Sequence, residues 1–272
     1  SIAMAAALPD TSGPNQWHVN LATGDTANNG LTAGTAKKYI SNITLGSRHT
    51  GTSLLTAGDT VNIAAGTYGE TVAIDTDNIW LLGADSTTTV INAGDSLAPG
   101  RIAIAAGGLA GLTVRNLEVT NAGDGIKLGM MTNTVLDAVM LRHNDIGLRA
   151  DSGTWLRLTD CSGRQNSVAV RCDSMARVTV IGGRYDTSVS SALALVMCDS
   201  VTLTGVATAG DSIGIALYGC TTALVSGASS AQDTTGIMAL GGAGVQLLNC
   251  RVAGPARDGI AADGVAALTI SG

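Results

Sequence analysis

A short motif that returns about every 22 residues constrains this chain more than any other feature. Seven copies carry a small turn-forming residue at the same place, between two short apolar stretches. These residues are Asn116, Asp137, Asp160, Gly182, Gly205, Gly227 and Asn249, at steps of 21, 23, 22, 23, 22 and 22. Asparagine, aspartate and glycine tolerate the left-handed backbone of a sharp corner between two strands. A repeat this regular predicts a solenoid, in which each coil buries its apolar side against the next coil.

A second apolar stretch follows each turn residue by about ten residues, which predicts a second strand in every coil. These stretches are 125–128, 146–148, 168–170, 193–195, 213–215, 236–238 and 259–261. A third short strand is expected in each coil as well. Residues 93–101 enlarge one coil and are expected to project as a loop.

Composition agrees with one long solenoid domain. The 272 residues include 36 glycines and no phenylalanine, and only 13% are charged. We expect a lead-in segment at 1–16 and one domain at 17–272, with a cap and entry at 17–60 and coils at 61–272. The net charge of −6 argues against nucleic-acid binding through a broad basic surface. The sequence has no run of 18 apolar residues, so we predict no membrane span.

The entry of the domain carries two further motifs. One is Ala-Gly-Asp-Thr-Val at 57–61, and the other is Gly-Thr-Tyr-Gly-Glu at 66–70. Together they resemble the N-terminal entry of right-handed parallel β-helix proteins of the pectate-lyase-like superfamily. The resemblance implies an all-β fold, a right-handed single-stranded parallel β-helix. It also implies a short N-terminal capping helix, for which the apolar spacing of Tyr39, Ile40 and Ile43 suits residues 36–45. Since this superfamily includes lyases, hydrolases, epimerases, phage tailspikes and adhesins, the resemblance does not fix an activity.

The C-terminal residues 268–272 begin a new coil without a polar cap. Solenoids normally cover such an apolar end. The expectation is a longer chain or a covering partner, as in a homotrimer or an end-to-end self-association.

The five cysteines do not match a metal site. Cys172 and Cys198 stand near equivalent places on adjacent coils, where a disulfide is conceivable, whereas Cys161 and Cys250 are four coils apart. The favoured interpretation is that all five are small buried apolar residues. No metal site is predicted, and the only cofactor that the resemblance suggests is calcium.

Charged residues gather in three consecutive coils between 142 and 186. Arginines recur at 142, 164 and 184, and the pairs Arg149/Asp151 and Arg171/Asp173 are 22 residues apart. Stacked coils should align such residues in columns about 5 Å apart. The predicted substrate-binding residues are Arg142, His143, Arg149, Arg164, Arg171, Arg184 and Tyr185. The candidate catalytic residues are Asp145, Asp151, Asp173 and Asp186.

These residue types suit an anionic polysaccharide. Guanidinium groups pair with sugar carboxylates, and Tyr185 or Trp155 is expected to stack on a sugar ring. By resemblance, a lyase of the pectate type uses arginine or lysine to take the proton beside a uronate carboxylate, often with calcium. A glycoside hydrolase needs two carboxylates about 5–10 Å apart. The alternative is a set of solvated columns in which arginine and aspartate compensate each other's charge.

Two hypotheses about function therefore stay open. The first is a protein of the extracellular space, cell surface or phage virion that binds polysaccharide or a cell-surface glycan. If it is an enzyme, it is a polysaccharide lyase or a glycoside hydrolase. The second is a non-catalytic structural solenoid, such as a fibre, an adhesin or a self-assembly module.

Overall fold

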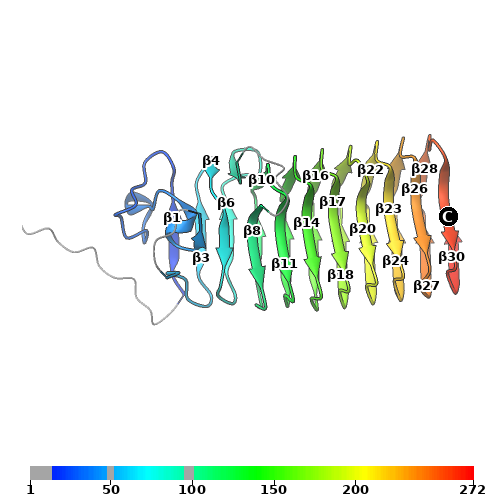
Figure 1. The fold of residues 1–272 in the computed structure, drawn as a ribbon, viewed down its shortest axis with the longest axis horizontal. Coiled ribbons are helices and arrows are strands. Elements are labelled where there is room, and N and C mark those ends of the chain that lie inside the picture. The colour runs from blue at the N-terminus through cyan, green and yellow to red at the C-terminus, as the bar shows by residue number, and fades with distance from the viewer. Residues whose placement is uncertain (1–13, 48–51, 95–100) are drawn as a thin grey trace, which may run out of the picture.

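The computed structural model describes residues 14–47, 52–94 and 101–272. Its coils stack along one axis, with the N-terminal entry at one end and residue 272 at the other (Figure 1). Each regular coil adds one strand to each of three sheets, in the order sheet A, sheet C, sheet B. The predicted all-β parallel solenoid and its third short strand are confirmed. The predicted loop at 93–101 falls mostly outside the described residues.

Sheet A contains eleven of the described strands. They are β1 (Gln16–Val19), β3 (Thr60–Ile63), β6 (Trp80–Gly83), β9 (Thr113–Arg115), β12 (Thr134–Asp137), β15 (Leu156–Thr159), β18 (Arg177–Ile181), β21 (Ser200–Thr204), β24 (Thr222–Ser226), β27 (Gly244–Leu248) and β30 (Ala267–Ser271). All of them pair in parallel, residue for residue, with the same position one coil away.

Sheet C contains nine of the described strands, most of them only three residues long. They are β4 (Gly66–Gly69), β7 (Thr89–Asn92), β10 (Glu118–Thr120), β13 (Met140–Arg142), β16 (Ser162–Arg164), β19 (Arg184–Asp186), β22 (Ala207–Ala209), β25 (Ser229–Ala231) and β28 (Arg251–Ala253).

Sheet B contains ten of the described strands. They are β2 (Leu45–Gly46), β5 (Val72–Ile74), β8 (Ile102–Gly107), β11 (Asp124–Gly129), β14 (Ile146–Asp151), β17 (Val168–Asp173), β20 (Ser191–Val196), β23 (Ile213–Tyr218), β26 (Thr235–Leu240) and β29 (Asp258–Asp263). Strand β2 pairs antiparallel with β5, unlike the regular coils.

The corner between sheet A and sheet C explains the sequence repeat and corrects one of its members. The left-handed residues there are Asn116, Ala138, Asp160, Gly182, Gly205, Gly227 and Asn249, so the steps are 22, 22, 22, 23, 22 and 22. Asp137 is therefore not the turn residue. It is the last residue of β12 and lies on the outer face of sheet A.

The corner between sheet C and sheet B holds a buried polar column. Its members are Asn144, Asn166, Ser188, Asp211 and Asp233, all at most 3% exposed. The Oδ1 atom of Asn144 accepts a hydrogen bond from the backbone N–H of Ala122, and Asn166 does the same for Asn144. Such bonds tie successive coils together inside the corner, where no water reaches the backbone.

The predicted N-terminal capping helix is wrong in form. The structure has two single-turn 3₁₀ segments, η1 (Ala33–Thr35) and η2 (Ile40–Asn42). A helix cannot span 36–45, because Lys37 forms a β-bridge with Val19 near its start and Leu45 pairs with β5 at its end. Ile40 and Ile43 are fully buried all the same, so this segment adds to the core at the entry.

The two entry motifs serve the fold. Asp59 is fully buried and accepts hydrogen bonds from the Trp17 indole N–H and the Thr56 backbone N–H, at 2.8 and 2.9 Å. Glu70 accepts hydrogen bonds from the backbone N–H groups of Ile40 and Ser41, at 3.0 and 2.9 Å. Buried carboxylates of this kind fix irregular entry segments that have no ladder to pair with.

The cysteines are free thiols in the structure. Cys172 pairs in register with Leu195, so it is not the neighbour of Cys198 in a column, and the suggested bridge between them is wrong. Cys198 and Cys220 instead follow the ends of β20 and β23 at the same place in adjacent coils. Burial raises the pKa of Cys161 to about 12, which suppresses its thiolate.

A thiol reagent should therefore distinguish these cysteines. In native protein we expect only the partly exposed Cys250 to react quickly with a maleimide, about one equivalent of five. Mass spectrometry of peptides locates the label, and denatured protein provides the control with five labels. Fast labelling of Cys161 or Cys172 in native protein would contradict the buried placement.

Candidate functional site

A groove runs along the outer face of sheet A. Two adjoining hollows form it, with volumes of about 360 and 530 Å³, and Arg115 lines both. We call it the sheet A groove; its main lining residues are Trp80, Arg115, Val135, Asp137, Trp155 and Arg157. Ala33 and Ala36 of the entry segment line one side of the larger hollow, next to His18 and Asn62.

Two tryptophans flank the smaller hollow. The Trp80 side chain projects outward from β6 and is 42% exposed, because its neighbour Leu81 takes the inward position. Trp155 precedes β15, three coils further along. At about 4.8 Å per coil, the two rings are about 14 Å apart along the axis. Register places Thr113 and Val135 in the same outward column as Trp80, between Trp80 and Arg157, where their short side chains form the floor of the hollow.

The charges in the groove differ in how they are paired. Arg115 forms an ion pair with Asp137 at 2.5 Å. Arg157 is exposed, and its Nε donates a hydrogen bond to the Thr159 hydroxyl at 3.3 Å. Within residues 14–47, 52–94 and 101–272, no carboxylate forms an ion pair with Arg157. Its guanidinium is therefore available to a ligand carboxylate.

The predicted patch at 142–186 is divided between two other faces. On sheet C, Arg142 aligns with Arg164, but the next residue in that column is Asp186. Arg184 aligns with Ser162 instead, so the predicted column of three arginines is wrong. The spacing of 20 rather than 22 residues places Arg184 two positions earlier in its strand.

Carboxylates neutralise part of this sheet C cluster. Glu118 pairs with Arg142 at 3.0 Å, and Asp186 pairs with Arg164 at 3.5 Å and with Arg184 at 2.5 Å. Asp186 is only 4% exposed, whereas more than half of each of the two arginine side chains that it holds is exposed.

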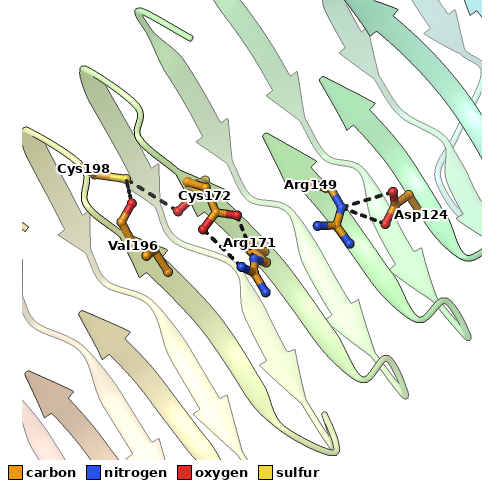
Figure 2. A network of polar contacts seen from close by, with 7 residues as sticks. Asp124, Arg149, Arg171, Cys172, Val196 and Cys198 are labelled. Carbon is orange, nitrogen blue, oxygen red and sulfur yellow. Dashed lines mark hydrogen bonds and ion pairs between the residues drawn. The ribbon is translucent and has the colours of Figure 1, made fainter. Parts of the chain in front are cut away.

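On sheet B, two of the predicted columns are present. Arg149 aligns with Arg171, and Asp151 aligns with Asp173. Arg149 contacts both carboxylate oxygens of Asp124 at 3.1 Å (Figure 2), and Arg171 pairs with Asp173 at 2.7 Å. Desolvation and the nearby charge of Asp173 raise the pKa of Asp151. These pairings agree with the alternative to a polysaccharide site, in which arginine and aspartate columns neutralise each other's charge.

Three other predicted residues have separate surroundings. Tyr185 is fully buried, so its predicted stacking on a sugar is wrong. Strand alternation points Arg184 and Asp186 outward and Tyr185 into the core, where Gly163 of the adjacent coil leaves room for its ring. His143 lies exposed at the left-handed corner position, and Asp145 is exposed just before β14.

Sequence reasoning noted Trp155 but missed Trp80, Arg115, Asp137 and Arg157 as members of one site. Strict alternation along each sheet A strand would have identified them. Inward Leu81, Val114, Leu136 and Leu158 imply that their neighbours point outward. The repeat pattern places Asp137 at the corner, so it does not predict that this side chain lies on the outer face of sheet A.

No protein-family model and no curated protein matches the sequence. Among solved structures, the chain is similar to pectate lyase Pel9A, with 11% identity and a TM-score of 0.59, covering 87% of this chain and 72% of that one. It is also similar to a rhamnogalacturonan lyase, with 8% identity and a TM-score of 0.53, covering 86% and 81%. An alginate lyase from Paenibacillus sp. str. FPU-7 follows, with 14% identity and a TM-score of 0.50, covering 79% and 92%.

The chain has the parallel β-helix fold of these proteins. The resemblance predicted from the entry motifs is thus confirmed for the fold. Identities this low show the fold alone. In the described part of the chain, no helix is long and apolar enough to cross a membrane. Nor does that part contain a group of three or more histidine, cysteine, aspartate or glutamate side chains placed to hold a metal ion.

Proposed function

We propose that this protein binds an acidic polysaccharide in the sheet A groove. The observation that carries the proposal is a pair of tryptophans, Trp80 exposed and Trp155 partly exposed, that line the same hollow as Arg115 and Arg157. The apolar face of a sugar ring packs on an indole ring, and a tryptophan side chain has only two torsions to fix, so it loses little conformational entropy on binding. A guanidinium such as that of Arg157 recognises a uronate carboxylate with two parallel hydrogen bonds.

The fold supports the polysaccharide part of the proposal. The three similar structures carry the names of lyases that act on pectate, alginate and rhamnogalacturonan. Function does not follow from fold alone, so the groove remains the main support. A location outside the cell, at a cell surface or on a virion, belongs to the same proposal because acidic polysaccharides occur there.

The groove supports binding more directly than cleavage. Among the described residues, Asp137 is the only carboxylate that lines either of its hollows, and Arg115 holds it in an ion pair. Hydrolysis of a glycosidic bond normally needs two carboxylates. Asp145, Asp151, Asp173 and Asp186 lie outside the groove. Their catalytic roles stay predictions.

Removing the tryptophans tests the proposal. We expect Trp80→Ala and Trp155→Ala each to weaken binding of oligogalacturonate or oligoalginate about tenfold, or about 1.4 kcal/mol. Isothermal titration calorimetry measures the affinity. Met197→Ala is the matched control, because it also removes a large apolar side chain, which is 62% exposed and follows directly after β20.

Two results would contradict the proposed function. One is a parent protein that binds no acidic oligosaccharide at millimolar concentration. The other is unchanged affinity in both tryptophan variants. The first result would favour the non-catalytic structural solenoid.

A further inference from the structure

A separate hollow, of about 460 Å³, lies on the outer face of sheet C, where the size of the outward side chains changes abruptly. We call it the sheet C hollow. Its wall is formed by Arg164, Arg184 and Asp186, its floor includes Ala209, and Gln165 and Gln232 lie at its rim. It belongs to a different sheet from the groove described above.

The shape follows from the register. The outward column that contains Arg142, Arg164 and Asp186 continues with Ala209 and Ala231. The parallel column passes from Arg184 to Ala207 and Ser229. Large charged side chains on one side and small alanine and serine side chains on the other therefore leave a step, and the hollow lies at its foot.

The wall of the hollow is positively charged. Arg164 and Arg184 both contact the same atom of Asp186, its Oδ2, and Oδ1 of Asp186 is buried without a hydrogen-bond partner. Two guanidinium groups and one carboxylate leave one positive charge. Since each guanidinium has five N–H donors and more than half of each side chain is exposed, several donors remain free for a ligand.

The rim adds neutral hydrogen-bonding groups at the coil spacing. The left-handed position of the corner between sheets C and B is occupied in four successive coils by Gln165, Thr187, Gly210 and Gln232. Three of these residues carry a polar side chain. They therefore recur at multiples of about 4.8 Å along the axis. Amide and hydroxyl groups at this spacing suit the hydroxyls of an extended sugar chain, whose residues have a similar length.

We propose that the sheet C hollow is a second, independent binding site, which takes the carboxylate of an acidic oligosaccharide. Asp186 holds the two guanidinium groups in place, and their free edges receive the carboxylate. The amides of Gln165 and Gln232 bind neighbouring hydroxyls. This inference goes beyond the sheet A groove, because it needs neither tryptophan and predicts a second equivalent of ligand.

Calorimetric titration with trigalacturonate at low ionic strength tests the second site. We expect the parent to bind two equivalents and the double variant Arg164→Gln/Arg184→Gln to bind one. Arg251→Gln is the matched control and should bind as the parent does, because Arg251 is exposed in the same outward column as Arg184, three coils away. Ala209→Met fills the hollow without changing any charge, and we expect it to weaken this site at least tenfold.

Several outcomes would overturn the inference. They are two equivalents bound by the double arginine variant, unchanged binding by Ala209→Met, or equally tight binding of the neutral maltotriose. Acetate that binds as tightly as trigalacturonate would also overturn it, since the site would then recognise a small anion and not a glycan. The two sites fail separately: Trp80→Ala reports on the sheet A groove, and the arginine and Ala209 variants report on the sheet C hollow.

Discussion

Replacing Asp211 with asparagine is expected to stabilise the protein at pH 8 by on the order of 3 kcal/mol and to remove much of its pH dependence. Asp211 is 3% exposed and stands in the buried polar column between sheets C and B. Burial raises its pKa to about 7, and the charges of Asp233 and Asp186 add to the effect, whereas a hydrogen bond from Ser188 opposes it.

Comparison within the column explains why asparagine should fit. Nδ2 of Asn144 donates to the Val119 carbonyl at 3.1 Å, and Nδ2 of Asn166 donates to the Leu141 carbonyl at 2.9 Å. The equivalent acceptor for residue 211 is the carbonyl of Tyr185. Asp211 Oδ2 is buried without a partner, so only a protonated carboxyl could imitate the asparagine there. Asp233 differs, because the Thr208 and Ser230 hydroxyls donate to its Oδ2.

The direction of the pH effect follows from the raised pKa. Below about pH 4 the carboxyl is protonated in both the folded and the unfolded state, so it has no effect. Between about pH 4 and 7 the unfolded chain loses this proton while the folded chain keeps it, and stability falls as the pH rises. Above about pH 7 the full cost of a buried charge is present.

Urea unfolding of parent and Asp211→Asn at pH 5 and pH 8 measures this effect. The two proteins should differ most at pH 8 and less at pH 5. Asn166→Asp is the reverse control, and it should introduce a new loss of stability with rising pH. Equal pH profiles for parent and Asp211→Asn would contradict the assignment of this buried acid.

Replacing Asp59 with alanine is expected to destabilise the protein by about 3–5 kcal/mol. The carboxylate accepts hydrogen bonds from the Asn15 backbone N–H and from both the backbone N–H and the hydroxyl of Thr56, besides the Trp17 indole. Alanine would leave these donors unpaired in a site that excludes water. The entry to the first coil should therefore open first, before the central coils.

Far-UV circular dichroism during urea unfolding measures the loss in the Asp59→Ala variant. Asp75→Ala removes an exposed carboxylate a short distance along the chain and should change stability by less than about 0.5 kcal/mol. A loss below about 1 kcal/mol for Asp59→Ala would show that the entry motif does not depend on this carboxylate.

The coil repeat was predictable because six of the seven left-handed residues at the corner between sheets A and C are asparagine, aspartate or glycine. The exact position of the turn residue in one coil was not predictable. Ala138 takes the left-handed conformation there, a conformation that alanine rarely adopts, so the residue pattern pointed to Asp137. That shift of one residue moved Asp137 from the outer face of sheet A into a corner and concealed its pairing with Arg115.

The candidate site was harder to predict because proximity between coils depends on register. Arg184 resembles Arg142 and Arg164 by residue type, yet register places Asp186 in their column. Tyr185 has the chemistry of a sugar-binding residue, but alternation along β19 directs it into the core. Residue type alone thus predicts one continuous site at 142–186, where the structure divides these residues between two sheets, and it does not predict the groove around Trp80.

The most direct test of glycan binding in the sheet A groove is a crystal structure of the protein soaked with trigalacturonate. We predict sugar density over Trp80 and between Trp80 and Trp155, with a uronate carboxylate on the guanidinium of Arg157. An empty sheet A groove at saturating ligand, in a crystal where no neighbouring molecule covers it, would contradict the proposed function.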